Sequence, residues 1–255
     1  MSLATRHLRL LPLCLAAALA PSLAAARDDP PALSPSLDLE VGVVTAGKND
    51  VRIPGDGGTR FSLTEGSFST RASPYVRVQG GLAYGRHHLL ATAALLRLKS
   101  GGQDGDPIAF AGSTFSPSAT DATYRFDTYR LTYRYALVRR DRLELQVGAT
   151  ALLRSAEIKL TSGAESASKS NLGLVPLLSL RAAWRVVGPL SLVLDGDALA
   201  APQGRAEDAL LAVELDTGDL RFRVGYRIIE GGADNRSVYN FALLHHLAVG
   251  MTYAF

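Results

Sequence analysis

Three features of the sequence predict an all-β fold, a closed antiparallel transmembrane β-barrel. Apolar and polar residues alternate with a period of two in ten successive segments, short and long connections alternate between those segments, and arginines crowd the face opposite the apolar one. A period of two is that of a β-strand, in which successive side chains point to opposite faces. We therefore expect ten strands, with eight or twelve as the alternatives.

The alternating segments follow one another along most of the chain without a helical period between them. Each is long enough to cross a membrane as a tilted strand or nearly so. They lie at 36–46, 73–84, 87–99, 122–138, 142–161, 171–187, 189–201, 206–216, 219–231 and 238–255.

The connections between these segments differ in length in a regular way. The short ones are 85–86, 139–141, 188 and 217–218, and the longer, polar ones are 47–72, 100–121, 162–170, 202–205 and 232–237. Short periplasmic turns and longer extracellular loops are typical of outer-membrane barrels. An even strand count also puts both chain ends on the periplasmic side. Within the first long connection, "TRFSLTEG" could form an additional hairpin above the membrane.

The two faces of the predicted strands favour a barrel in lipid over a water-soluble sandwich. In 219–231, Leu220, Phe222, Val224, Tyr226 and Ile228 alternate with Arg221, Arg223 and Arg227. A sandwich buries its apolar face and seldom packs arginines so densely opposite it, whereas a membrane barrel turns apolar residues outward and charges inward.

Aromatic residues lie near several predicted periplasmic strand ends, where a membrane barrel carries an aromatic girdle. The alternative is that they are ordinary core residues. They are Tyr133, Tyr135, Trp184, Tyr226 and Tyr253.

The first 26 residues predict a cleaved secretory signal. Arg6 and Arg9 precede an apolar stretch that ends in three alanines, Ala24 to Ala26. Leu13 is too large for the position before a lipoprotein cysteine, so Cys14 does not indicate a lipid anchor. We therefore divide the chain into a signal peptide at 1–26, a short periplasmic segment at 27–35 and a barrel domain at 36–255.

Composition excludes several function classes for the mature chain. Cys14 is the only cysteine, so cleavage leaves no thiol for a disulfide, a nucleophile or a zinc ligand. Removal of 1–26 takes away Arg6 and Arg9 and leaves 25 Lys and Arg against 24 Asp and Glu. This balance gives no indication of nucleic-acid binding.

The C-terminal segment "LAVGMTYAF" ends on the aromatic residues Tyr253 and Phe255. It resembles the insertion signal of bacterial outer-membrane barrel proteins. The stretches "YRLTYRYAL", "GYRIIEGGAD" and "VYNFALLHH" are similar to segments of an uncharacterised group within that class of small barrels. The resemblance implies the outer membrane of a Gram-negative bacterium as location. It also implies outer-membrane lipid, lipopolysaccharide and the barrel assembly machinery as partners, and it leaves the oligomeric state and any activity open.

The predicted inward positions place many charges in the lumen. Eight arginines face six carboxylates there, and guanidinium and carboxylate groups pair with matching geometry. The predicted network comprises Asp38, Glu40, Arg77, Arg130, Arg134, Glu144, Arg181, Arg185, Asp195, Asp197, Glu214, Arg221, Arg223 and Arg227. It could form a salt-bridged plug or line a narrow, mildly cationic passage for anions. Ten strands enclose little more space than side chains fill, which favours the plug.

Three groups of residues are candidates for a catalytic or ligand-binding site. Asp195 and Asp197 share a face and could position a water, but partners for lumen arginines are the simpler interpretation. His245 and His246 point to the lipid interface and the lumen, and no serine stands two residues after His245.

The third group is Glu230 and Asp234, which flank two glycines and could hold a cation at the outer surface. The pair His87 and His88 belongs to a predicted periplasmic turn. We therefore predict no catalytic residue, metal or cofactor.

The sequence favours an integral, non-enzymatic barrel with a salt-bridged lumen. Its role would be in envelope structure, surface interaction or narrow anion-leaning permeability. The alternative is an outer-membrane hydrolase acting on lipid A, phospholipid or peptide.

Overall fold

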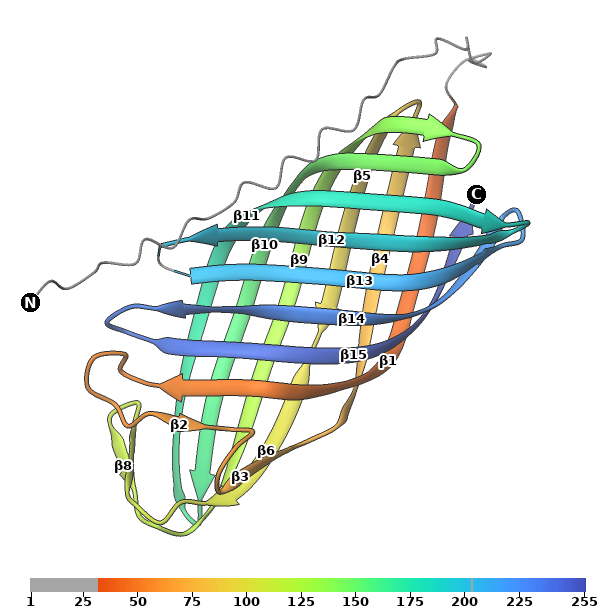
Figure 1. Cartoon of the computed structure of the whole chain (residues 1–255). Helices are drawn as coiled ribbons and strands as arrows, with labels where there is room; N and C mark the ends of the chain where they lie inside the picture. Colours follow the sequence, from red (N-terminus) through yellow and green to blue (C-terminus); the bar gives the residue numbers. More distant parts are fainter. Residues whose placement is uncertain (1–31, 203) are drawn as a thin grey trace, which may run out of the picture. The chain divides into compact units, whose positions relative to one another are not determined.

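The computed structural model describes residues 32–202 and 204–255, and these form an all-β fold (Figure 1). The predicted signal peptide, and residues 27–31 of the predicted periplasmic segment, lie outside the described residues. The described part contains no helix long and apolar enough to cross a membrane.

Fifteen strands build the fold, and several of them are much longer than the alternation alone indicated. They are β1 (Leu33–Arg52), β2 (Phe61–Ser62), β3 (Phe68–Arg71), β4 (Ser73–Tyr84), β5 (His87–Leu95), β6 (Arg97–Gln103), β7 (Ile108–Phe110), β8 (Ser113–Phe115), β9 (Ala119–Arg140), β10 (Leu143–Ser162), β11 (Glu165–Val187), β12 (Leu190–Ala201), β13 (Gly204–Asp216), β14 (Leu220–Asp234) and β15 (Tyr239–Ala254).

Ten strand paths close into an antiparallel ring, which confirms the predicted barrel and its strand number. The order is β1, β4, β5, β9, β10, β11, β12, β13, β14, β15 and back to β1. Strands β3 and β6 continue β4 and β5 past interruptions at Ala72 and Leu96. The β1–β15 ladder runs from Ser36 opposite Ala254 to Arg52 opposite Tyr239. Closure removes the free edges that an open sheet would present to lipid.

The two ends of the barrel differ in their connections, but the predicted loops 202–205 and 232–237 are shorter than expected, because β12 runs to Ala201 before β13 begins at Gly204, and β14 runs to Asp234 before β15 begins at Tyr239. One end has two-residue turns at Gly85–Arg86, 141–142 and 188–189, a three-residue turn at 217–219, and the start of β1 and end of β15. Gly85 and Gly188 have positive φ values of 59° and 52°, which glycine adopts without strain. The longest connections, 53–67 and 104–118, lie at the other end.

The predicted loop at 162–170 is wrong. Strands β10 and β11 continue to a two-residue turn at 163–164, in which Gly163 has a φ of 58°. Residues 165–171 are mostly polar and exposed, and within them Ala167 packs against the apolar core. This part of β11 therefore lacks the large apolar residues whose alternation reveals a strand in the sequence.

The two longest connections fold back into the mouth of the barrel. Phe61, Leu63, Phe110 and Phe115 from these segments are buried, together with inward apolar residues of β6, β9 and β10. The hairpin expected within 59–66 is reduced to the two-residue strand β2, which pairs with β1. The half of the lumen at this end is thus filled by an apolar core, which the sequence analysis did not predict.

Large apolar side chains face outward along the wall strands, and the charged ones between them face inward. On β9, Leu131 and Leu137 are each 55% exposed, whereas Arg130 and Arg134 are buried. The aromatic residues expected in the girdle also point outward, so they are not core residues. This inversion of the usual inside and outside is what a barrel surrounded by lipid requires.

We expect an arginine on this outer surface to destabilise the protein according to its depth. Leu131 lies near the middle of the apolar stretch of β9, and the equally exposed Leu137 lies two residues from Arg139. Leu131→Arg should lower the free energy of unfolding in lipid vesicles by about 2–4 kcal/mol, and Leu137→Arg by less than about 1 kcal/mol. Denaturant titrations of both variants measure this difference. Equal losses, or none, would contradict the lipid-facing assignment.

Phe255 provides a second test at the short-turn end. Its ring is exposed and meets that of Tyr253 edge-on, with centroids 4.7 Å apart. Phe255→Asp removes an apolar anchor and the predicted assembly signal, so the amount of heat-modifiable barrel in the outer membrane should fall while export continues. Phe255→Leu serves as the control and should assemble. Normal assembly of the Asp variant would refute the predicted role of this residue.

Candidate functional site

The candidate site is the charged lumen between the short-turn end and the apolar core. Alternate residues of each wall strand point inward, so arginines two or four positions apart on β9 and β14 share this space with carboxylates of β1, β12 and β13. Nearly all of these side chains are buried.

Asp208 on β13 lies at the centre of the lumen and binds three arginines. Its Oδ2 forms an ion pair with Arg130 Nη2 at 2.7 Å and accepts from Arg77 Nη1 at 3.3 Å, while its Oδ1 accepts from Arg227 Nη1 at 2.5 Å. These arginines come from β9, β4 and β14. The contacts of Arg130 and Arg77 therefore connect β13 to strands across the ring, whereas β14, which carries Arg227, is the neighbour of β13.

Glu40 on β1 forms a second centre next to the first. It is fully buried, and Arg227 binds it in a forked arrangement at 2.9 and 3.0 Å. Tyr75 Oη donates to it at 3.0 Å and Arg223 Nη2 at 2.9 Å. Arg223 also donates to both carboxylate oxygens of Asp38. Every acceptor site of Glu40 is thus engaged by a donor from another strand.

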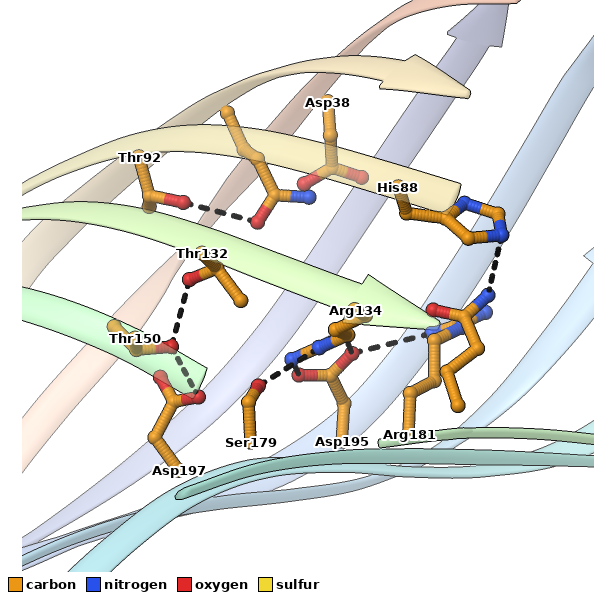
Figure 2. Close-up of polar contacts among 12 residues, drawn as sticks. Asp38, His88, Thr92, Thr132, Arg134, Thr150, Ser179, Arg181, Asp195 and Asp197 are labelled. Carbon is orange, nitrogen blue, oxygen red and sulfur yellow. Dashed lines mark hydrogen bonds and ion pairs between the residues drawn. The ribbon is translucent and has the colours of Figure 1, made fainter. Parts of the chain in front are cut away.

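A further branch joins β9 to β11 and β12 (Figure 2), and Arg181 extends it to β13. Arg134 forks onto Asp195 at 2.8 and 3.0 Å, and its Nε donates to Ser179 at 2.8 Å. Arg181 lies between Asp195 and Glu214, at 3.5 and 3.3 Å.

Asp197 links this branch to the centre of the lumen. It accepts from Arg130 Nη1 at 2.8 Å and from the Thr150 hydroxyl at 2.9 Å, and that hydroxyl is also hydrogen-bonded to Thr132 (Figure 2). Arg130 therefore spans from Asp197 to Asp208.

The paired charges of the lumen balance. We call this set the lumen network: Arg77, Arg130, Arg134, Arg181, Arg223 and Arg227, with Asp38, Glu40, Asp195, Asp197, Asp208 and Glu214. Six cations meet six anions. Buried charges are tolerated when they are paired and hydrogen-bonded, and every member of this set is paired, although Arg130 Nε has no hydrogen-bond partner among the described residues.

Eleven of the fourteen predicted lumen residues belong to this network, and three lie outside it. Glu144 is near the short-turn end, 4.0 Å from His88 Nε2 and from Arg139 Nη2. Arg185 is exposed beside a register irregularity. Arg221 is half-buried and makes no ion pair with a described residue.

Asp208 is the member that sequence reasoning missed. Asp208 and Glu214 are an even number of residues apart in the segment 206–216, so both face the same side of the strand, and Glu214 is predicted to face inward. The alternation therefore contained the signal that could have found it. The excess of arginine expected from the sequence becomes a balance of six and six once Asp208 is counted and Glu144, Arg185 and Arg221 are set apart.

Two cavities border the lumen network from opposite sides. A polar cavity of about 310 Å³ extends from Ser34, Ala83 and Ala254 at the short-turn end to Arg77 and Arg227. A smaller, mainly apolar cavity of about 60 Å³ reaches Arg130 and Asp208 from the other side. The network thus lies between them.

The residues considered for catalysis are engaged elsewhere. Asp195 and Asp197 bind Arg134 and Arg130, respectively. His246 is buried against the edge of the Tyr75 ring, with centroids 4.7 Å apart, and His245 is hydrogen-bonded to Tyr226.

Glu230 and Asp234, which could hold a cation according to the sequence, do not form a metal site in the part of the chain that the structure describes. Glu230 pairs with Arg205. Within 32–202 and 204–255, no three His, Cys, Asp or Glu side chains lie close enough together to hold a metal ion.

No protein-family model and no curated protein matches the chain. Among solved structures, the outer membrane protease OmpT from Escherichia coli is 10% identical, with 87% of this chain and 97% of that one covered at a TM-score of 0.49. The attachment invasion locus protein Ail of Yersinia pestis, solved with sucrose octasulfate, is also 10% identical, covering 87% and 99% at 0.36. Neisserial surface protein A is 12% identical, covering 88% and 97% at 0.33. Identities and TM-scores this low do not assign a function to the chain.

The chain's own architecture identifies its class. Ten antiparallel strands close without an edge, the outer surface is apolar, and the lumen holds balanced, hydrogen-bonded charges. The protein is a small outer-membrane β-barrel of the Gram-negative type, with buried salt bridges in its lumen.

Proposed function

We propose that the protein is a non-enzymatic outer-membrane barrel with a closed lumen, serving envelope structure or surface interaction. The observation that carries the proposal is the set of three arginines on Asp208, which crosses the lumen from β4, β9 and β14 to β13. A lumen crossed in this way has no continuous water path through the network.

The surroundings of the network support a closed barrel. The polar cavity reaches it from the short-turn end, and the apolar core with Phe110 and Phe115 covers it from the other end. A narrow anion passage would need unpaired cations along its length, and the network has equal numbers of both charges. The unpaired Arg221 lines only the polar cavity.

The alternative of a hydrolase receives less support. Catalysis by a carboxylate or an imidazole requires a group that is free to exchange a proton with substrate or water. Asp195 and Asp197 are each held by arginine, and His246 is buried behind the Tyr75 ring. This engagement favours the non-enzymatic function.

Conductance in planar bilayers tests the closed lumen. The refolded protein should show no steady ion current. Arg130→Ala combined with Asp208→Ala removes the link between β9 and β13 and should raise the current, whereas Arg221→Ala in the polar cavity should leave it unchanged. A steady, anion-selective current through the unaltered protein would show that the lumen is open.

Thermal unfolding tests the energetic role of the network. Asp208→Ala leaves three buried arginines without their shared partner. Loss of one member of a buried pair costs on the order of 3–5 kcal/mol, so the unfolding temperature should fall clearly. Arg181, which is partly exposed, should give a smaller decrease when changed to alanine, and adding Glu214→Ala should recover part of it.

Two further variants keep this test decisive. Asp208→Asn retains an acceptor oxygen, so its unfolding temperature should lie between that of the unaltered protein and that of Asp208→Ala. It provides the measurement if Asp208→Ala fails to assemble. Arg221→Ala serves as the control and should unfold like the unaltered protein. An Asp208→Asn barrel with unchanged stability would mean that the central pairing contributes little.

A further inference from the structure

The polar cavity at the short-turn end is lined by more cationic side chains than anionic ones. It measures about 310 Å³, the volume of about ten water molecules in the liquid, and it ends at the lumen network. Its seven arginines and four carboxylates are Arg77, Arg134, Arg139, Arg181, Arg221, Arg223 and Arg227, with Asp38, Glu144, Asp195 and Glu214. Only an arginine whose donors are not all used by the protein is available to a ligand.

Four of the seven arginines are held by the protein itself. Arg134, Arg181 and Arg227 each donate three hydrogen bonds to described residues. Arg223 donates five. Arg139 stands at the rim, where its side chain is 47% exposed, and lies 4.0 Å from Glu144. Arg77 and Arg221 remain.

Arg77 is buried at the inner end of the cavity with most of its donors unused. It is 8% exposed, and its only hydrogen bond with a described residue runs from Nη1 to Asp208 at 3.3 Å. Glu40, directly opposite on β1, is taken by Arg223 and Arg227. A guanidinium carries several N–H donors, and buried donors without an acceptor are costly. Arg77 therefore offers donors to a ligand in the cavity.

Arg221 is a second cation available in the same cavity. It is half-buried and makes no ion pair or hydrogen bond with a residue that the structure describes. Asp216, opposite Arg221 in register, accepts instead from the backbone N–H of Gly218. Arg221 stands two residues before Arg223 on β14, so both side chains face the lumen.

Strand register places these two arginines on separate parts of the wall. Arg221 is opposite Thr252, Thr252 is opposite Asp38, and Asp38 is opposite Gln79. Gln79 follows Arg77 by two residues on β4, so three strand spacings, about 14 Å along the wall, separate the strands of the two arginines. Two cations fixed on separate strands suit a ligand with two anionic groups.

We propose that the polar cavity binds a small dicarboxylate that enters from the short-turn end. One carboxylate accepts from Arg77, whose planar fork matches two carboxylate oxygens, and the other accepts from Arg221. Gln79 uses its Oε1 to accept from Thr92, so its amide N–H groups are left for the ligand. The site adds ligand binding to the closed barrel, and it requires no passage of ions through the lumen network.

Isothermal titration calorimetry of the refolded barrel in detergent tests the site with unbranched dicarboxylates from malonate to adipate. Because the two arginines are fixed, affinity should depend on chain length. The best dicarboxylate should bind at least about tenfold more tightly than the monocarboxylate with the same number of carbons. Arg221→Gln should remove this advantage. Arg185→Gln, which removes the same charge from an exposed residue outside the cavity, should bind like the unaltered protein.

Two further variants test the inner anchor and the entrance. Arg77→Lys keeps a cation for Asp208 but loses the fork, so it should weaken binding of the best dicarboxylate. Ala83→Trp obstructs the short-turn end of the cavity without changing its charge and should weaken binding of every probe.

Three results overturn the proposal: affinity that does not vary with chain length, equal binding of monocarboxylates and dicarboxylates, or an equal loss in Arg185→Gln. Inorganic phosphate that binds as tightly as the best dicarboxylate would also overturn it, because one anion would then suffice. Ion current in bilayers, by contrast, would count against the closed lumen and not against this site.

Discussion

The pairing of Asp208 with three arginines is the constraint on which the rest of the lumen depends. Arg77, Arg130 and Arg227 reach this one carboxylate from three different strands. Without it, three guanidinium groups would share a confined space, and Arg77 would lose its ion pair. Glu40 and Asp197 each hold one of these arginines from another direction, so the positions of the surrounding strands are specified together.

The outer surface and the lumen of the barrel wall are subject to two different physical constraints. Lipid cannot hydrogen-bond, so the ring must close and its outward side chains must be apolar. Most of the charged side chains in the lumen are buried, so they must satisfy one another, and six arginines with six carboxylates do so. The apolar core formed by the two longest connections covers the network on one side, and the polar cavity lies on its other side.

The same wall also shows how position along a strand changes what a side chain does. On the outward face of β9, Arg125 lies beyond the apolar surface, and Tyr129 and Leu131 lie within it. On the inward face, Arg130 and Arg134 belong to the lumen network, and Tyr124 belongs to the apolar core. One strand thus contributes to the lumen network and to the outer surface, with alternation separating the two.

The sequence by itself determined the closed antiparallel barrel, its ten strands and the face that most side chains occupy. A period of two and the short turns are local properties, and lipid allows only a closed sheet. The tertiary structure alone decided that Asp208 is the shared partner, that Arg185 stays out of the network, and that β10 and β11 extend through 162–170. It also decided that Phe110 and Phe115 fill the mouth. Alternation says which face a residue occupies, but partners across the lumen depend on the radius and register of the closed ring, which no local pattern encodes.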